Sequence, residues 1–295
     1  MAPMSRYFCS NNTPNEQVVD YYRRRAEGGI GLIITEGACI DHPAANGYKD
    51  VPFIYGEKPL NGWKKVVDAV HDSETKIFSQ LWHVGAFRNM EVSFNQKSPA
   101  YSPSGIFSLG KKNGIAMSMK DIDTVITAYA QAALDAKQVG FDGIEIHAGH
   151  GYLIDQFFWK DTNTRRDSFG GSIKNRTQFA TEIIQAIKQA AGKTFPISLR
   201  WSQWKQQDYK ARLALTPAEL EQFLSPLASA GVDMFHCSTR HALTAEFTDS
   251  TLSLAGWTKK ITGKPTVAVG NIGIDFDGKD GQFKSAYSTL LEIDE

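Results

Sequence analysis

The chain has 295 residues, 42% of them hydrophobic, which is enough for one large domain or two ordinary ones. Lys+Arg and Asp+Glu are equal at 32 each, and this balance argues against nucleic acid or an anionic membrane surface as a partner. Cys9, Cys39 and Cys237 show no Cys-x-x-Cys spacing, and no apolar run is long enough to span a bilayer. These features predict a cytoplasmic protein without a disulfide framework, a zinc site or a membrane segment.

Short runs rich in β-branched and aromatic residues alternate along the chain with stretches of helical period. The predicted strands are residues 31–37, 76–83, 142–148, 196–202, 232–238 and 265–273. Residues 1–4 resemble the tail of a further strand. The predicted helices are residues 14–29, 118–140 and 216–231. Alternation of this kind favours βαβ units and a parallel sheet, in one domain over residues 1–295.

The helix boundaries follow from capping residues. Pro14 is expected at the start of the first helix, and Ser118 with Asp121 has the spacing of a capping box. Thr216 is expected to cap the third helix, with Pro217 in the first helical position and Glu219 completing the box.

The ends of the predicted strands decide between two kinds of parallel sheet. Nearly every strand ends in polar residues or glycine, such as Gln80, His147 and Arg200. In a (β/α)8 TIM barrel all these ends converge on one face, where the active site is built. A dinucleotide-binding sheet would carry Gly-x-Gly-x-x-Gly after its first strand, and no early strand here is followed by that motif. The prediction is therefore an α/β fold of the TIM-barrel type.

Residues 145–157, EIHAGHGYLIDQF, contain the most distinctive polar group. The alternation of residues 142–148 places His147 at a strand tip, and the glycines on either side of His150 disfavour a helix. Three interpretations are open: a metal site, two hydrogen-bonded strand-end histidines, or a pair of neutral donors with Tyr152 as proton donor. Paired donors suit an oxygen atom that gains negative charge in a transition state.

Residues 147–176, HAGHGYLIDQFFWKDTNTRRDSFGGSIKNR, resemble the signature of the Old Yellow Enzyme family of FMN-dependent ene-reductases. That family is a TIM barrel with a His-x-x-His or His-x-x-Asn pair and a Tyr two residues later. Further resemblances follow in the family's order, at residues 2–6, 32–37, 80–85, 199–209, 231–240 and 254–273. The resemblance covers essentially the whole chain.

The resemblance implies FMN as the cofactor and NADH or NADPH as the reductant, in a ping-pong reaction with hydride transfer through FMN N5. His147 and His150 would bind the carbonyl or nitro oxygen of a small electrophilic alkene. Tyr152 would protonate the α-carbon, and Trp82 would border the substrate pocket. The resemblance implies no metal, and a homo-oligomer stays open.

The resemblance also implies which residues hold FMN. They are Pro3, Met4 and Ser5 at the pyrimidine edge, Gly37 and Gln80 at the isoalloxazine, Arg200 at N1/O2, and Gly270 and Asn271 at the phosphate. Structural roles would also explain some of them. Gln80 would then fill a layer of the barrel, and Arg200 would form an ion pair with Glu36 or Glu145.

The sequence departs from the family pattern at both ends. One residue precedes Ala2, and residues 288–295 stand where the family begins an eighth strand that ends in a Gly-Arg pair. The fold expected is thus a (β/α)8 barrel without the start of its first strand and without its eighth βα unit. An alternative function follows, a truncated, flavin-poor or inactive paralogue. A flavin-free barrel such as an aldolase lacks support, because no strand ends in a lysine suited to a Schiff base.

Overall fold

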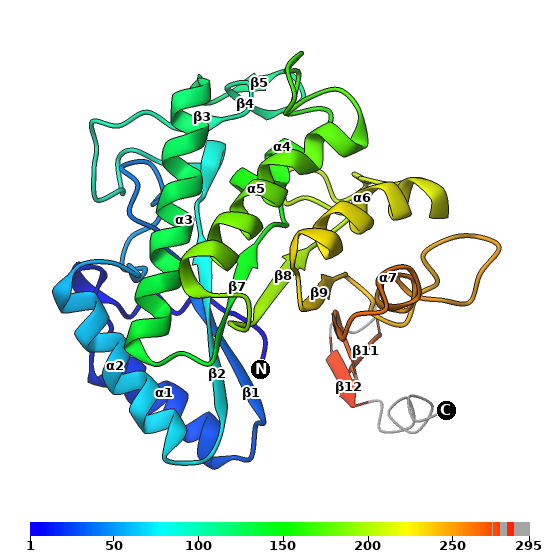
Figure 1. The fold of residues 1–295 in the computed structure, drawn as a ribbon. Coiled ribbons are helices and arrows are strands. Elements are labelled where there is room, and N and C mark those ends of the chain that lie inside the picture. The colour runs from blue at the N-terminus through cyan, green and yellow to red at the C-terminus, as the bar shows by residue number, and fades with distance from the viewer. Residues whose placement is uncertain (273, 278–281, 286–295) are drawn as a thin grey trace.

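A six-stranded parallel sheet forms the centre of the protein (Figure 1). The computed structural model describes residues 1–272, 274–277 and 282–285. The order of the sheet is β1-β2-β7-β8-β9-β10, so neighbours in the sheet follow one another along the chain. These strands are β1 (Leu32–Cys39), β2 (Lys76–Trp82), β7 (Gly143–His147), β8 (Ile197–Trp201), β9 (Met234–Ser238) and β10 (Thr266–Val269). Because the strands are parallel, their carboxyl ends lie at one edge of the sheet.

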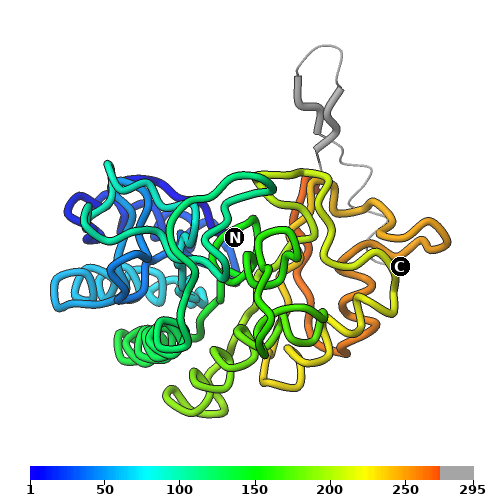
Figure 2. Tube along the Cα trace, turned by 90° about the horizontal axis from the view of Figure 1, so that it is seen from above, coloured from blue at the N-terminus to red at the C-terminus, as the bar shows by residue number. Residues whose placement is uncertain are grey.

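Helices alternate with these strands and lie in an arc around the outside of the sheet (Figure 2). They are α1 (Glu16–Glu27), α2 (Glu57–His71), α3 (Met119–Val139), α5 (Ile173–Ala191), α6 (Pro217–Ala230) and α7 (Leu254–Thr262). Consecutive helices pack on one another, as α3 does on α5 and α5 on α6. Ile144, Ile146 and Leu199 of the sheet are fully buried in the apolar core. Burial of each such side chain contributes roughly 1.5–3 kcal/mol.

Short elements occupy the segments between the main helices and strands. They are η1 (Ser10–Asn12), η2 (Gly85–Phe87), α4 (Leu153–Phe158), β3 (Tyr101–Ser102), β4 (Ile106–Ser108), β5 (Lys111–Lys112), β6 (Ile115–Ala116), β11 (Ile274–Asp277) and β12 (Gln282–Ser285). Three small pairs form among them: β3 with β6, β4 with β5, and β11 with β12. The first two pairs lie in the connection from β2 to α3, and α4 follows β7 directly. They therefore belong to the same edge of the sheet as the carboxyl ends of the strands (Figure 1).

All six predicted strands are confirmed, with ends that shift by a few residues. The largest difference is at residues 265–273, where β10 ends at Val269 because Gly270 and Asn271 take positive φ angles of 143° and 49°. Residues 1–4 form no strand, so the expectation that they are the tail of a further strand was wrong. They still lie beside β1, since the Met1 amino group donates to Leu32 O at 2.6 Å and Ile34 N donates to Met1 O at 3.1 Å.

Two of the helix predictions are confirmed and one start is corrected. The capping box of Ser118 and Asp121 is present at the start of α3. Thr216 caps α6 with Pro217 at its first turn, but the Glu219 carboxylate accepts from Leu215 N, one residue before the expected donor. α1 begins after Asn15, whose side chain accepts from Gln17 N and Val18 N. The N-cap is thus one residue later than Pro14, because Asn provides the acceptor that Pro lacks.

The described residues form part of the expected barrel. β1 and β10 are the two outer strands of the six-stranded sheet in the part of the chain that the structure describes. The predicted position of the eighth βα unit, residues 288–295, lies outside the described residues. None of the described helices is long and apolar enough to cross a membrane.

Candidate active site

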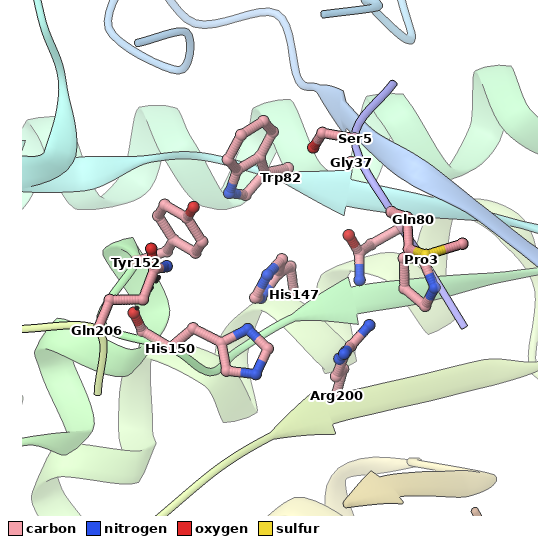
Figure 3. Close-up of a pocket in the computed structure, with 11 residues that line it drawn as sticks. Pro3, Ser5, Gly37, Gln80, Trp82, His147, His150, Tyr152, Arg200 and Gln206 are labelled. Carbon is pink, nitrogen blue, oxygen red and sulfur yellow. Dashed lines mark hydrogen bonds between the residues drawn. The ribbon is translucent and has the colours of Figure 1, made fainter. Parts of the chain in front are cut away.

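The carboxyl edge of the sheet surrounds one pocket that gathers most of the predicted functional residues (Figure 3). Its lining residues are Pro3, Met4, Ser5, Gly37, Gln80, Trp82, His147, His150, Tyr152, Arg200 and Gln206. Of the residues predicted for catalysis, substrate binding or cofactor binding, only Gly270 and Asn271 lie outside this lining. The pocket and its open mouth together enclose about 410 Å³.

A tight turn after β7 places His150 and Tyr152 at the pocket. His150 and Gly151 have φ angles of 62° and 86°, a region that costs a non-glycine residue energy. Two hydrogen bonds hold the turn: His150 N donates to Ser202 Oγ at 2.9 Å, and Gly151 N donates to Asp155 Oδ2 at 2.6 Å. Helix α4 starts only after Tyr152. The histidines are therefore not on a helix, and the described residues contain no group of three or more His, Cys, Asp or Glu arranged around a metal position.

A fully buried ion pair lies under this turn. Lys205 Nζ donates to Asp155 Oδ1 at 2.7 Å, and both side chains have an exposure of 0%. Lys205 also donates to Ser202 O at 3.0 Å. Burial raises the pKa of Asp155 to about 6, against the opposing effect of the Lys205 ammonium group. The pair connects the loop after β7 to the loop after β8, and these loops supply His150, Tyr152 and Gln206.

Both histidines of the pocket are neutral at neutral pH. Burial lowers the pKa of His147 to about 3; Arg200 adds to the effect and Glu145 opposes it. Burial also takes the pKa of His150 well below its usual 6.5, with contributions from His147 and Arg200. A neutral imidazole carries one N–H donor and one acceptor nitrogen, so the hydrogen bonds around each ring determine which nitrogen is the donor.

The neighbours of the two rings indicate their tautomers. Gly149 N faces His147 Nδ1 at 3.5 Å, which makes Nδ1 the acceptor and Nε2 the donor. Ser238 Oγ lies 2.7 Å from His150 Nε2. When this hydroxyl donates to Nε2, the proton of His150 is on Nδ1. Each ring then has one N–H group that no protein acceptor among the described residues occupies.

The rings converge closely enough to act on one small group. The centroids of His147 and His150 are 5.1 Å apart, and those of His147 and Tyr152 are 5.0 Å apart. Trp82 packs edge-on against Tyr152 at 5.1 Å and is 3% exposed, so it is both a pocket residue and a core residue. Burial raises the pKa of Tyr152, while its hydrogen-bonding contacts with Tyr48 and Gln206 lower it. Two neutral N–H donors and one phenol proton thus face a common space.

Arg200 is the charged residue of the pocket lining, and no carboxylate in the part of the chain that the structure describes pairs with it. It is 8% exposed, its Nε has no partner, and no carboxylate of the described residues lies within ion-pair distance. Pairing with Glu36 or Glu145, the structural interpretation of this residue, is therefore not found. Burial lowers the pKa of Arg200, and the field of Glu145 opposes that effect.

Gln80 belongs to a buried polar network below the pocket. Its Nε2 donates to Glu145 Oε1 at 2.9 Å. The other oxygen of Glu145 accepts from Ser198 Oγ at 2.9 Å and contacts His236 Nδ1 at 2.7 Å. Burial alone would raise the pKa of Glu145, but His236, Arg200 and Gln80 together lower it to about 2. The network fixes the Gln80 amide at the pocket floor.

The residues present fit the ring system of FMN. A buried guanidinium nitrogen without a partner costs free energy unless a ligand supplies an acceptor. Arg200 Nε has no partner among the residues that the structure describes. Gly37 allows close packing at the same place, because a Cβ there would lie 2.8 Å from the Trp82 indole. Arg200, Gln80, Gly37 and the segment from Pro3 to Ser5 would hold the ring.

Gly270 and Asn271 lie outside the pocket lining, and Gly270 packs against the loop after β9. A Cβ at Gly270 would lie 2.4 Å from Thr239 O, and Gly270 O accepts from Ala242 N at 2.8 Å. Glycine is thus required here by close packing against the loop after β9. The contact of these two residues with a phosphate stays a prediction.

Three residues of the site were not among the predicted site residues. Gln206 lines the mouth of the pocket, Ser238 contacts His150, and Tyr48 contacts Tyr152. Gln206 stands in a polar run without periodicity, and Tyr48 is distant from its partner in the sequence. Ser238 ends the predicted strand 232–238, so the convergence of strand ends at one edge was the signal that could have found it.

Sequence comparison places the chain in a class of flavin-dependent oxidoreductases. The profile of the NADH:flavin oxidoreductase / NADH oxidase family matches residues 1–290, and the chain belongs to this family. The family match confirms the predicted resemblance to Old Yellow Enzyme. It also confirms, at the level of the family, FMN as the cofactor and NADH or NADPH as the reductant.

Several named relatives are similar over most of this chain. The chain is 38% identical over 205 residues to 12-oxophytodienoate reductase 7 of Oryza sativa subsp. japonica, covering 65% of this chain and 51% of the relative. It is 41% identical over 209 residues to chanoclavine-I aldehyde reductase of Penicillium roqueforti, covering 69% and 56%. With NADH oxidase of Thermoanaerobacter brockii the identity is 35% over 239 residues, covering 81% and 36%. The chain thus spans about half the length of these relatives, or less.

Solved structures share the fold. Morphinone reductase in complex with tetrahydroNAD has a TM-score of 0.80 and 27% identity, and the match covers 92% of this chain and 76% of that one. An Old Yellow Enzyme homologue from Zymomonas mobilis has a TM-score of 0.77 and 26% identity, covering 90% and 76%. These neighbours are TIM barrels, and the six-stranded parallel sheet corresponds to part of such a barrel.

Proposed function

We propose that the protein is an NAD(P)H-dependent ene-reductase that reduces the activated C=C bond of α,β-unsaturated carbonyl or nitro compounds. One observation carries this proposal: two neutral histidines and Tyr152 converge on a single pocket that also contains the unneutralised Arg200. The family is one of flavin oxidoreductases, and several relatives are named as reductases.

In this proposal the two histidines bind the substrate oxygen. His147 Nε2–H and His150 Nδ1–H donate to the carbonyl or nitro oxygen and stabilise the negative charge that develops there. This interaction withdraws electron density from the alkene and activates its β-carbon. Neutral rings suit the task, because they donate hydrogen bonds without releasing a proton at neutral pH.

Tyr152 completes the reduction as the proton donor. When bound, FMN would supply the hydride, with NADH or NADPH as the reductant. The Tyr152 hydroxyl then protonates the α-carbon, and its raised pKa keeps it protonated before that step. Trp82 and Phe87 pack around the Tyr152 ring at 5.1 and 5.0 Å and limit the access of water to it.

The proposed location is the cytoplasm, as the cysteine content predicts. Cys9, Cys39 and Cys237 are buried free thiols, a state that a reducing compartment preserves.

A first experiment tests whether this chain holds the cofactor. The protein is purified, its visible spectrum is recorded, and any flavin released on denaturation is identified. A flavin spectrum with FMN as the released species supports the proposal. Colourless protein that added FMN cannot reconstitute would refute it for this chain and favour the flavin-poor paralogue.

A second experiment tests the chemistry. Tyr152→Phe should slow the oxidation of the reduced enzyme by 2-cyclohexenone about 100-fold or more, the usual effect of losing a general acid. Reduction by NADPH should stay within about twofold of the unmodified protein, because that step needs no proton from Tyr152. Stopped-flow measurement of both half-reactions separates the two effects. An equal loss in both half-reactions contradicts the role of proton donor.

A further inference from the structure

The hydroxyl of Tyr152 has a partner outside the pocket. Tyr48 Oη lies 3.3 Å from Tyr152 Oη, and Tyr48 is not among the residues that line the pocket. Tyr48 lies in the loop after β1, 104 positions from Tyr152 in the sequence. The oxygen of Tyr152 therefore has one side toward the pocket and another toward the Tyr48 hydroxyl.

The direction of this hydrogen bond follows from the proposed chemistry. A phenol has one proton to donate, and the oxygen can also accept. If Tyr152 directs its proton into the pocket, its oxygen is free to accept from the Tyr48 hydroxyl. The bond then strengthens as the proton leaves, because a hydrogen bond to a charged oxygen is stronger than one to a neutral oxygen.

The surroundings of Tyr48 fix its hydroxyl in place. Its ring stacks on Trp82, with centroids 5.4 Å apart and planes inclined by 21°. Its backbone N–H donates to Asn46 Oδ1 at 3.0 Å. Arg88 Nη1 and Ser93 Oγ donate to Asn46 O, and both Arg88 and Asn46 are buried. A donor held by packing and by its own backbone is preorganised for its acceptor.

We propose that Tyr48 is a positioning residue of the reductase, which makes Tyr152 a stronger acid by donating a hydrogen bond to its oxygen. The inference rests on the proposed function, in which Tyr152 protonates the substrate. It extends that function by assigning a role to a residue that is not among those lining the pocket.

Electrostatics support the same direction of effect. Burial raises the pKa of Tyr152, and the hydrogen bonds with Tyr48 and Gln206 lower it. The pKa of Tyr48 is itself raised, by burial first and then by its contact with Tyr152, so Tyr48 keeps its proton while Tyr152 releases one. Without the Tyr48 hydroxyl, the pKa of Tyr152 would be higher, because one of the hydrogen bonds that oppose the effect of burial would be lost.

The test uses Tyr48→Phe, which removes the hydroxyl and keeps the ring that stacks on Trp82. In the FMN-loaded protein, oxidation of the reduced enzyme by 2-cyclohexenone should slow about three- to tenfold, the effect of losing one hydrogen bond to a developing charge. The solvent deuterium isotope effect on that step should rise, because proton transfer limits the rate more. Reduction by NADPH should be unchanged. Tyr55→Phe is the matched control: it lies in the same loop, and its ring stacks on Phe53 rather than near Tyr152.

A double-mutant cycle separates this role from a structural one. In the Tyr152→Phe background, Tyr48→Phe should have no further effect, because the acceptor oxygen is gone. Two outcomes overturn this inference and leave the proposed function intact. In the first, the losses of rate from the two substitutions are additive. In the second, Tyr152→Phe is slow but Tyr48→Phe is as fast as the unmodified protein. If Tyr152→Phe is itself as fast as the unmodified protein, the proton-donor role fails and the inference fails with it. Thermal unfolding of each variant checks that the fold is retained.

Discussion

The buried pair of Lys205 and Asp155 provides the sharpest test of how the site is held. Lys205→Met keeps the length of the side chain and removes its charge. Asp155 would then stay at 0% exposure and keep its bond from Gly151 N at 2.6 Å, but lose its ammonium partner at 2.7 Å. Removing one member of a buried ion pair costs about 3–5 kcal/mol, because the other charge is left uncompensated. We expect a loss of this size in the free energy of unfolding.

An exposed pair on the same protein offers a matched control. Lys65 Nζ lies 2.7 Å from Glu16 Oε1, the same separation as in the buried pair, but the two side chains are 65% and 77% exposed. Lys65→Met should therefore cost less than about 1 kcal/mol. Denaturant unfolding near pH 7, monitored by circular dichroism, measures both variants under the same conditions.

The double variant Asp155→Asn/Lys205→Met separates charge from packing. It leaves no charge in the buried position, and the amide oxygen can still accept from Gly151 N. The double variant should thus recover most of the stability lost in Lys205→Met. The reasoning is refuted if Lys205→Met costs no more than Lys65→Met, or if Asp155→Asn adds its own full cost in the double variant.

Three further predictions concern single groups of the site and core. Ser238→Ala removes the hydroxyl 2.7 Å from His150 Nε2. In a titration of the oxidised holoenzyme, the dissociation constant of the enone should rise about five- to thirtyfold. Unchanged affinity would exclude Ser238 from setting the tautomer of His150. Arg200→Gln removes a cation that favours the more negative, reduced cofactor, so the two-electron potential should fall by roughly 30–60 mV in a redox titration, and a rise would contradict this role. Glu36 is fully buried, and burial raises its pKa from 4.5 to about 7. The folded state therefore binds the Glu36 proton more tightly than the unfolded state does. This proton adds at most about 3 kcal/mol to the free energy of unfolding, and that contribution is lost as pH rises from about 4.5 through 7. Glu36→Gln should flatten the stability profile over that range, and an unchanged profile would show that Glu36 does not titrate there.

The sequence predicted the parts of the fold that depend on local patterns. The six strands and the capping of α3 by Ser118 follow from alternation and from short-range hydrogen bonding. The sequence was less accurate where a competing local group was present. Asn15 caps α1 in place of the expected start at Pro14, because its side-chain oxygen accepts two backbone N–H groups. Residues 1–4 lie beside β1 without forming a regular strand.

The candidate site shows the same division. Strand tips in a parallel sheet must meet at one edge, so Gln80, His147 and Arg200 could be placed together from their positions in the pattern. The partners of the turn after β7 were not predicted. Ser238, the last residue of β9, is 88 positions from His150, and Lys205 is 50 positions from Asp155. No periodicity pairs these residues with one another, and only the folded sheet defines their distances.

The charges of the pocket also suit the two ligands of the proposed reaction, the substrate and the cofactor. His147 and His150 are neutral, so they offer directional hydrogen bonds to a substrate oxygen without attracting anions in general. Arg200, the charged side chain among the described pocket residues, lies at the floor of the pocket beside the Gln80 network. A cation there interacts most strongly with a ligand that becomes negative when reduced, which is the role of the cofactor in the proposed reaction. Protonation of the histidines would place further positive charge near Arg200, and the like charges would repel one another. Burial of both imidazole rings prevents that conflict by keeping their pKa values far below neutral pH.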